Sequence, residues 1–362
     1  MAADATVPCG TLLGAITADG DEAFDADAFR RAHDRPAAVA RAPQRPVAPP
    51  AAAVAAAPTS RRAVAPAARA LAQQLGIETD AIPGSGPGGR VTREDVEAWA
   101  AARQRLTAAA DGVRLEVLRD GQGPPLALLP GFGSDVSAFA AQARALAATH
   151  AVLGINPRGV GASDAPPLEV YEVASAAADV AAVCGAPAHI VGASLGAATA
   201  IELALRYPER VRTLTLITPF VSASPRLLSV LDSWCRIAAE SRAETLARAL
   251  LPWLFSERLL ADAGARERVV RGLAASAAAV PAATLSRAAS GVRQWSGSRQ
   301  GDLAQIRVPT LVVVAGADLL TPDGQAVAAS IPGARTVVVA GAGHAVMIEA
   351  ADQVTAAILD NL

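Results

Sequence analysis

A serine stands between two glycines in the segment GASLG, residues 192–196, which fits the pattern GxSxG. The preceding residues, AHIV, predict a strand, and the following residues, AATAIELALRY, predict a helix. A sharp strand-to-helix turn needs glycines around the serine because larger side chains would clash, and it exposes the serine hydroxyl. A hydroxyl becomes a strong nucleophile only when a neighbouring base removes its proton. We therefore predict that Ser194 is a nucleophile that requires a base nearby.

Histidine is the usual base, and the chain has four, at positions 33, 150, 189 and 344. His344 follows the last predicted strand, so it comes at the carboxyl ends of the strands, where ligands bind in open α/β sheets. His150 and His189 come at the starts of strands, at the opposite edge, and we expect both to be structural. His344 is the predicted base.

An acid must orient the base, and in one known chain order it comes between the serine and the histidine. Asp318 lies in AGADLLTP, on the loop directly after the predicted strand VPTLVVV. Asp323 follows a proline in a turn, and we expect it to cap the next helix. Asp318 is the predicted acid.

Acyl transfer also needs two backbone N–H groups aimed at the oxygen on which negative charge develops. Leu195, directly after the serine, is expected to supply one of them. Phe132 in LLPGFGSD, after the first core strand, is expected to supply the other. Gly131 and Gly133 on either side of it allow the backbone to approach closely.

These residues must be positioned by a sheet, and six apolar segments resemble buried strands. They are PPLALLP, HAVLGINP, AHIVGAS, VRTLTLITP, VPTLVVVAGAD and ARTVVVAGAGH, and helical patterns separate them. This alternation predicts an α/β fold with a mostly parallel, doubly wound sheet covered on both faces. Residues 219–300 interrupt the alternation with an Ala/Leu/Arg-rich helical insertion that contains Trp234, Trp253 and Trp295.

Residues 104–362 resemble the α/β-hydrolase superfamily, with the elbow at Ser194, the acid at Asp318, the base at His344 and a helical cap at about 219–300. Two features depart from many relatives. This chain has Pro130-Gly131 where many have His-Gly, and NPRGVGAS, residues 156–163, where many have Asp-x-x-Gly-x-Gly-x-Ser. Neither departure removes a member of the predicted triad.

Composition excludes several classes of chemistry. The 362 residues contain no lysine, which excludes a Schiff base, pyridoxal phosphate attachment and lysine-borne lipoate. A net charge of −2 gives no reason to expect nucleic acid or an anionic membrane as a partner. Three dispersed cysteines without a CxxC pattern, and no signal peptide, indicate a cytoplasmic protein without a metal site or disulfides.

Two further segments precede the predicted hydrolase. Residues 35–60 are almost wholly Ala, Pro, Val and Arg, which predicts an extended tether. Residues 61–103 predict a small two-helix domain, in which Ala68, Leu71, Ala72 and Leu75 share one helical face and Gly76 ends the helix. Thr92 and Asp95 have the spacing of a capping box. The glycine-rich stretch GPGGRVTRED, residues 86–95, therefore predicts a turn between two helices rather than a phosphate loop.

The small domain resembles the peripheral subunit-binding domain of 2-oxo acid dehydrogenase acyltransferases over some forty residues. The matching positions are Pro66, Arg69, Leu71, Ala72, Gly76, Gly84, Gly86, Gly88, Gly89, Arg90, Val91, Glu94 and Asp95. The resemblance implies docking onto dihydrolipoamide dehydrogenase or a partner decarboxylase through Arg69 and Arg90. It also implies that Asp95 binds the amides of the glycine loop. Ala70 and Gln73 stand at other basic positions of the family, which implies weaker or altered docking.

The first residues carry a further resemblance. VPCGTLLGAITADGD, residues 7–21, resembles the closing strands of a lipoyl domain, so we interpret residues 1–34 as a remnant of one. Without lysine it cannot carry lipoate covalently. The whole arrangement is similar to the acyltransferase component of acetoin-cleaving dehydrogenase complexes, in which an α/β-hydrolase domain replaces the usual acyltransferase core.

Three functions follow as hypotheses. The first is a complex-associated acyltransferase or thioesterase that takes an acyl group from a lipoyl thioester and passes it to coenzyme A or water. For coenzyme A, Arg226, Arg236 and Arg242 of the insertion are candidate phosphate ligands. The second is a free-standing esterase, lactonase or carbon–carbon hydrolase with a vestigial docking domain. The third is a tether that recruits dihydrolipoamide dehydrogenase without catalysis.

Overall fold

A computed structural model describes residues 63–75, 77, 79, 82 and 84–362, apart from the side chains of 102–105. The predicted lipoyl remnant at 1–34, the tether at 35–60, His33 and Gly76 lie outside the described residues.

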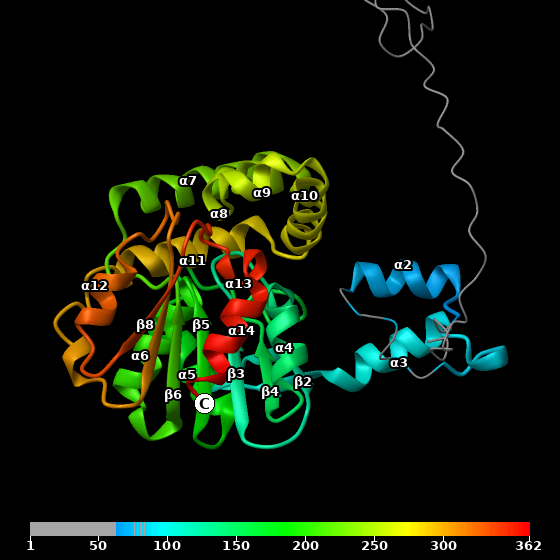
Figure 1. Cartoon of the computed structure of the whole chain (residues 1–362), viewed down its shortest axis with the longest axis horizontal. Helices are drawn as coiled ribbons and strands as arrows, with labels where there is room; N and C mark the ends of the chain where they lie inside the picture. Colours follow the sequence, from blue (N-terminus) through cyan, green and yellow to red (C-terminus); the bar gives the residue numbers. More distant parts are fainter. Residues whose placement is uncertain (1–62, 76, 78, 80–81, 83) are drawn as a thin grey trace, which may run out of the picture. The chain divides into compact units, whose positions relative to one another are not determined.

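The described residues of the small N-terminal domain form two α-helices, α2 (Pro66–Gln74) and α3 (Arg93–Arg103), with a short 3₁₀ turn, η2 (Pro87–Gly89), before α3 (Figure 1). Its core consists of small and branched side chains: Ala68, Ala72, Ile82, Val91 and Val96. The expectation that Leu75 joins this face is wrong. The helix ends one residue earlier, so Leu75 is the C-cap and is 46% exposed.

The glycine-rich loop closes on its own helix. The N–H of Thr92 donates to Oδ2 of Asp95 at 2.8 Å, and the N–H of Asp95 donates to Oγ1 of Thr92 at 3.2 Å, which confirms the capping box. The same Asp95 oxygen accepts from the N–H of Ser85 at 2.9 Å. Hydrogen bonds from Ser85 and then Thr92 lower the pKa of Asp95 to about 2. A Cβ at Gly84 would lie 2.2 Å from the carbonyl oxygen of Gly89, so this loop packs backbone against backbone.

Residues 104–362 are built on an eight-stranded sheet with the order β1-β2-β4-β3-β5-β6-β7-β8. The strands are β1 (Gln104–Ala108), β2 (Arg114–Asp120), β3 (Pro125–Leu129), β4 (Ala151–Ile155), β5 (Ala188–Ala193), β6 (Val211–Ile217), β7 (Thr310–Ala315) and β8 (Arg335–Val339). The six predicted strands are β3 to β8, and they pair in parallel. The hairpin β1–β2 was not predicted, and β2 pairs antiparallel with β4.

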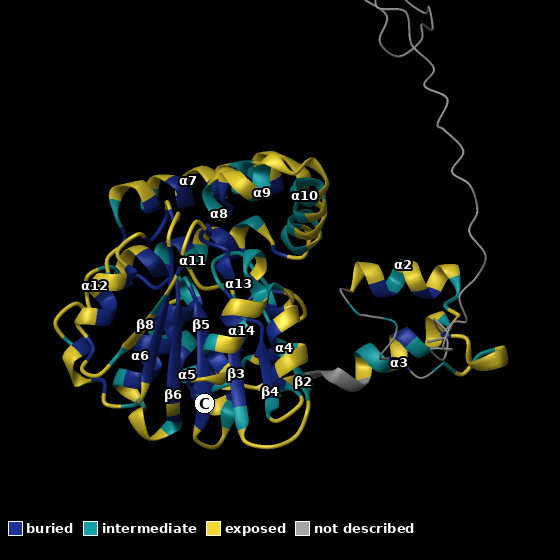
Figure 2. Ribbon diagram, in the orientation of Figure 1, coloured by how far each residue is buried: buried dark blue, intermediate teal, exposed yellow. Residues whose placement is uncertain are grey.

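Helices cover both faces of the sheet, whose central strands are buried along most of their length (Figure 2). Residues of α5 (Val173–Cys184), α6 (Leu195–Arg206) and α12 (Gly324–Ala329) belong to one hydrophobic core. Residues of α4 (Ala140–Leu146), α13 (Val346–Glu349) and α14 (Ala351–Leu359) belong to the other. The fold is therefore the predicted doubly wound α/β arrangement.

The insertion forms a helical cap between β6 and β7, beyond one end of the strands (Figure 1). Its helices are α7 (Pro225–Glu240), α8 (Ala243–Leu254), α9 (Glu257–Ala261), α10 (Ala263–Ala278) and α11 (Ala282–Trp295). No single described helix is long and apolar enough to cross a bilayer, although α10 and α11 meet the length and hydropathy requirement as a pair bent by 92°.

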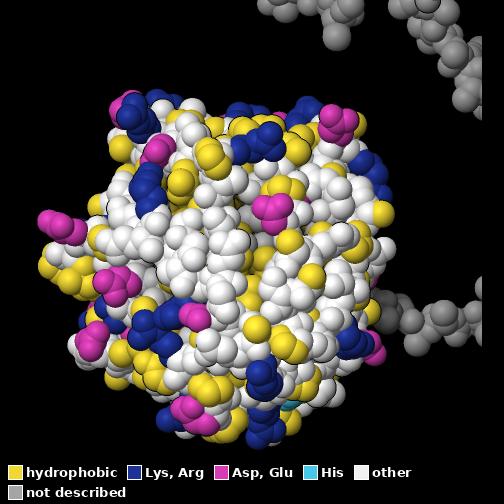
Figure 3. Space-filling view, turned by 90° about the vertical axis from the view of Figure 1, so that its left-hand side faces the viewer, with side chains coloured by type: hydrophobic (Ala, Val, Ile, Leu, Met, Phe, Trp, Pro, Cys, Tyr) yellow, Lys and Arg dark blue, Asp and Glu magenta, His cyan; other side chains and the backbone are white. Residues whose placement is uncertain are grey.

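A buried carboxylate fastens the end of the cap to the sheet domain. Glu202 of α6 is 1% exposed and accepts hydrogen bonds from Nε1 of Trp295 and Nε of Arg299, each at 2.8 Å. Burial alone would raise the pKa of Glu202, but the bonds from Arg299, Trp295 and Arg206 hold the pKa at about 2. On the face shown in Figure 3, basic and acidic side chains of the described residues are interspersed.

Candidate active site

Ser194 lies on a strained turn between β5 and α6, as the elbow pattern predicts. Its φ is +52° and its ψ −113°, a conformation that non-glycine residues rarely adopt. The flanking glycines are required by space. A Cβ at Gly192 would lie 2.2 Å from the carbonyl oxygen of Gly196, and a Cβ at Gly196 would lie 2.1 Å from that of Leu129.

Asp318 and His344 meet from two different loops. Asp318 follows β7 and His344 follows β8, and Nδ1 of His344 lies 2.8 Å from Oδ2 of Asp318. The residues are 8% and 6% exposed, respectively. Burial alone would raise the pKa of Asp318, but the imidazole of His344 and then the N–H groups of Thr321 and Leu320 hold the pKa below its ordinary value. The carboxylate therefore remains an acceptor for the Nδ1–H group.

Thr321, which the sequence did not predict as a site residue, contacts both Asp318 and His344. Oγ1 of Thr321 lies 2.8 Å from Oδ2 of Asp318, 3.0 Å from the carbonyl oxygen of Thr218 and 3.3 Å from Nδ1 of His344. Thr218 follows β6 with a positive φ of 44°. A single hydroxyl thus connects the acid, the histidine and the end of a third strand.

Ser194 and His344 line the same cavity of about 580 Å³, between the sheet and the cap. Among the described residues, no hydrogen bond joins their side chains. Such bonds are often long in ligand-free enzymes and shorten when substrate binds. The structure therefore brings together Asp318 and His344 directly, and brings Ser194 to the same cavity.

The two candidate oxyanion donors lie on adjacent backbone segments. A Cβ at Gly131 would lie 3.4 Å from Cβ of Ser194, so the loop after β3 runs beside the elbow. Phe132 lines the cavity, and Leu195 is the first residue of α6. Within the described part of the chain, neither N–H group has a recorded acceptor. Both are therefore available to a ligand.

The histidine loop is also tied to the cap by a residue that sequence patterns missed. Oε2 of Glu349 accepts from the N–H groups of Gly343 and Ser256, each at 3.1 Å, and its other oxygen accepts from the hydroxyl of Ser256. The N–H of Ala345 donates to the carbonyl of Leu254 at 2.8 Å. Residues on both sides of His344 are thus held against the cap segment that joins α8 and α9.

The other candidates lie elsewhere. His150 and His189 come at the starts of β4 and β5, as expected, with their ring centroids 5.4 Å apart. Asp323 occupies the N-cap position of α12, but its side chain makes no capping hydrogen bond, so that part of the expectation is wrong. Among the described residues, no group of three or more His, Cys, Asp or Glu side chains is arranged to hold a metal.

The arginines proposed for coenzyme A are not in the cavity. Arg226, Arg236 and Arg242 are exposed, and none of them lines it. The sequence could predict that these arginines belong to the helical cap, but it could not predict which side of each cap helix faces the cavity. The arginine that does line the cavity is Arg268 of α10.

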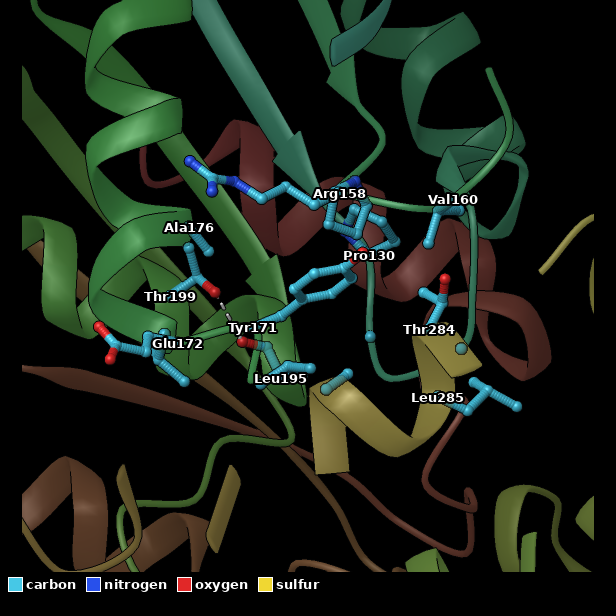
Figure 4. Close-up of a pocket in the computed structure, with 15 residues that line it drawn as sticks. Pro130, Arg158, Val160, Tyr171, Glu172, Ala176, Leu195, Thr199, Thr284 and Leu285 are labelled. Atoms are coloured by element: carbon cyan, nitrogen blue, oxygen red, sulfur yellow. Dashed lines mark hydrogen bonds between the residues drawn. The ribbon is translucent and has the colours of Figure 1, made fainter. Parts of the chain in front are cut away.

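A second, smaller cavity of about 70 Å³ lies behind the oxyanion loop (Figure 4). It shares Gly131, Gly133 and Leu285 with the large cavity. The ring of Tyr171 points into it, while Oγ1 of Thr199 donates to the carbonyl of Leu195 at 3.1 Å. The residues behind the predicted oxyanion donors are therefore loosely packed.

Arg69 and Arg90, the predicted docking residues, are both exposed on the small domain. Neither forms an ion pair with another described residue. Arg93 of the same domain, by contrast, is paired with Glu97 at 2.8 Å.

Comparison with known families identifies both domains. Residues 124–351, more than half of the chain, match the α/β hydrolase fold family, and residues 63–97 match the E3 binding domain. Among curated relatives, the polyketide synthase ThaQ of Burkholderia thailandensis is 30% identical over 76% of this chain, but the chain spans only 13% of that protein's length.

A second relative shares more of its own length. The dihydrolipoyllysine-residue acetyltransferase component of the acetoin cleaving system of Cupriavidus necator is 30% identical over 70% of this chain and 67% of that protein. Among solved structures, a hydrolase from Pseudomonas aeruginosa is 30% identical with a TM-score of 0.65, covering 72% of this chain and 98% of the other.

Proposed function

This chain belongs to the α/β-hydrolase fold family and carries an E3-binding domain ahead of the hydrolase fold, and from that premise we propose that it is a serine-dependent acyltransferase or thioesterase component of an acetoin or 2-oxo acid dehydrogenase complex. The observation that carries the proposal is the fusion of a docking domain to a cavity lined by Ser194 and by the Asp318-bound His344.

In the proposed mechanism, Ser194 attacks the carbonyl carbon of an acyl thioester. Nε2 of His344 takes the hydroxyl proton, and Asp318 stabilises the imidazolium and fixes its orientation. The carbonyl oxygen becomes an oxyanion that accepts hydrogen bonds from the N–H groups of Phe132 and Leu195, each worth about 3 kcal/mol in such sites. The carbon–sulfur bond then breaks, and the thiolate leaves with the proton from His344.

The acyl-enzyme is resolved by a second nucleophile. Water or the thiol of coenzyme A gives its proton to His344 and attacks the ester carbonyl, and Ser194 leaves with the proton returned. Neither step requires a covalently bound cofactor, which is consistent with a chain that has no lysine for lipoate. The lipoyl thioester or coenzyme A would be a substrate.

Membership of a complex rests on the small domain. We propose that it binds dihydrolipoamide dehydrogenase or the decarboxylase component in the cytoplasm, with Arg69 and Arg90 meeting acidic groups of that partner. The exposure of both arginines, and the absence of any described intramolecular ion pair for either, support this role.

A second candidate function is a free-standing small-molecule esterase, lactonase or carbon–carbon hydrolase. The similarity to the Pseudomonas aeruginosa hydrolase favours it, because that likeness covers almost all of the other chain and does not need the docking domain. In this case the same triad would act on a small ester.

Labelling with a fluorophosphonate probe tests the chemistry. The probe should label the wild type at Ser194 and leave a Ser194→Ala variant unlabelled. An unlabelled wild type contradicts both enzymatic proposals and leaves only the non-catalytic tether.

Binding to dihydrolipoamide dehydrogenase tests membership of the complex. We expect binding that weakens with salt and weakens further in Arg90→Ala. Arg93→Ala is the matched control, because Arg93 lies on the same domain and already pairs with Glu97. No binding of the wild type at low salt to this enzyme or to the decarboxylase component would favour the free-standing hydrolase.

A further inference from the structure

The cavity above Ser194 is much larger than an acetyl group. It has a volume of about 580 Å³, within the range of pockets that enclose whole drug-sized ligands. An acetyl group has three non-hydrogen atoms and fills roughly the space of two or three waters, each about 30 Å³. Most of the cavity is therefore unused by a two-carbon acyl group.

Its wall is apolar and comes mainly from the cap. Leu227, Leu231 and Trp234 of α7 line one part, and Leu246 and Leu250 of α8 line another. The ring of Trp234 stacks on that of Phe132, with the centroids 6.4 Å apart, so the apolar wall reaches the oxyanion loop. A wall of this kind stabilises an alkyl chain by about 0.8 kcal/mol for each buried CH₂ group, which is about a fourfold gain in affinity.

Among the residues that line the cavity, Arg268 is the one basic side chain apart from His344. None of the lining residues is an aspartate or glutamate. The Arg268 side chain is exposed. No carboxylate oxygen of the described residues lies within 4 Å of its guanidinium nitrogens. Arg268 interacts electrostatically with Asp262, whose carboxylate also accepts from the N–H of Ala265 at 2.9 Å. Arg268 is therefore a cation without an ion pair among the described residues, at the rim of an apolar cavity.

From these observations we infer that the cavity binds a medium-chain acyl group of about six to ten carbons, carried as a thioester in a substrate whose anionic group Arg268 binds. The inference rests on the proposed function for the identity of the reacting group, and it defines the substrate class of that site. An upstream decarboxylase that supplied such a group would have to act on a 2-oxo acid with a correspondingly long chain.

Binding without turnover tests the chain length. The Ser194→Ala variant is titrated calorimetrically with acetyl-, butyryl-, hexanoyl- and octanoyl-coenzyme A. We expect the affinity to rise by at least about 100-fold from acetyl to octanoyl, below the ideal product of six fourfold steps because ordering the chain opposes binding. Equal affinities, or tightest binding of the acetyl thioester, would overturn the inference.

A glycine in the cavity wall provides a matched variant. Gly272 of α10 lines the cavity, and a Cβ there would meet nothing within 4 Å, so a larger side chain has space to extend. Leucine is also the better helix former, so the substitution should not impair folding. Introduced with Ser194→Ala, Gly272→Leu should weaken octanoyl-coenzyme A at least about tenfold and leave acetyl-coenzyme A within about twofold. Unchanged octanoyl binding would overturn the assignment of this cavity.

A second pair of variants tests the cation. Arg268→Gln should weaken octanoyl-coenzyme A about tenfold, whereas Arg271→Gln, on the same helix but not in the cavity lining, should not. Octanoyl-pantetheine, which is uncharged, should bind both variants equally. If the loss appears instead with the pantetheine monothioester of octanedioic acid, the anion lies on the acyl chain. If Arg268→Gln weakens neither octanoyl-coenzyme A nor the pantetheine monothioester of octanedioic acid, the proposed role of Arg268 is overturned.

These outcomes separate the inference from the proposed function. A wild type labelled at Ser194 whose cavity prefers the acetyl thioester keeps the proposed function and overturns the inference. An unlabelled wild type whose Ser194→Ala variant still gains affinity with chain length overturns the proposed function and keeps the inference.

Discussion

Nδ1 of His344 lies 2.8 Å from Oδ2 of Asp318. Counting side-chain atoms alone, His344 is 7% exposed and Asp318 is 2% exposed. An ionised carboxylate can only accept, so Nδ1 carries the proton of a neutral imidazole and Nε2 is the free base. The pair therefore presents the tautomer that serine activation needs.

Replacing the acid by its amide should remove most of the activity. Asp318→Asn can turn its NH₂ group toward Nδ1 and so favour the wrong tautomer, and we expect kcat to fall about 10⁴-fold, as in serine proteases. Asp323→Asn is the control, because this side chain makes no capping hydrogen bond. Steady-state kinetics on a thioester substrate would contradict the assignment if the two variants lost activity equally.

The sequence could predict that the site lies at the carboxyl ends of the parallel strands. The elbow is a local pattern, and the loops after β7 and β8 follow uninterrupted apolar runs, so Asp318 and His344 could be placed at one edge before any coordinates. The hairpin β1–β2 could not be found in this way. Its residues alternate with charges, and Glu116 of β2 is buried where Asn156 and Ala162 donate to its carboxylate from a distant loop.

The residues that support the site were also beyond local patterns. Thr321 acts through Thr218, a residue 103 positions away in the sequence, and Glu349 acts through Ser256, 93 positions away. Nothing in their immediate neighbours distinguishes them from a turn threonine and a helical glutamate. The catalytic roles of Ser194, Asp318, His344, Phe132 and Leu195 stay predictions, because they concern a reacting substrate.

The hydroxyl of Thr321 should matter to catalysis. Thr321→Val keeps the shape but removes the group that lies between Asp318 and the carbonyl of Thr218. We expect kcat to fall about tenfold, because a buried hydrogen bond to a charged group is worth about 1.5–3 kcal/mol. Thr321→Ser retains the hydroxyl and should restore most of the activity. Equal losses in the valine and serine variants would assign the effect to packing instead.

Glu349 should hold the histidine loop against the cap. Glu349→Leu removes the acceptor of the N–H groups of Gly343 and Ser256, and leaving such buried groups unpaired costs about 1–3 kcal/mol. We expect a matching loss of unfolding free energy, together with a lower kcat from a displaced His344. Arg258→Gln removes only the exposed partner at 3.7 Å and should change neither quantity by more than about 0.5 kcal/mol. Denaturant unfolding and kcat measured on both variants check this, and a stable, fully active Glu349→Leu would refute the link.

The two histidines at the far edge of the sheet should make stability depend on pH. Burial lowers the pKa of His189, and the charges of His150 and Arg212 lower it further, while burial lowers the pKa of His150. Because the folded pKa lies below the unfolded value near 6.5, the unfolded chain binds more protons, so the unfolding free energy falls as the pH drops below about 6.5. Each histidine contributes at most about 1.4 kcal/mol of unfolding free energy per pH unit, and its contribution levels off below its folded pKa.

The variant His189→Asn should flatten this pH dependence. Asparagine retains a hydrogen-bond partner for Oγ1 of Thr213, which lies 3.0 Å from Nδ1 of His189. Denaturant unfolding between pH 5 and 8, with His150→Asn in parallel, measures both contributions, and a variant whose slope equals that of the wild type would show that His189 does not titrate with folding.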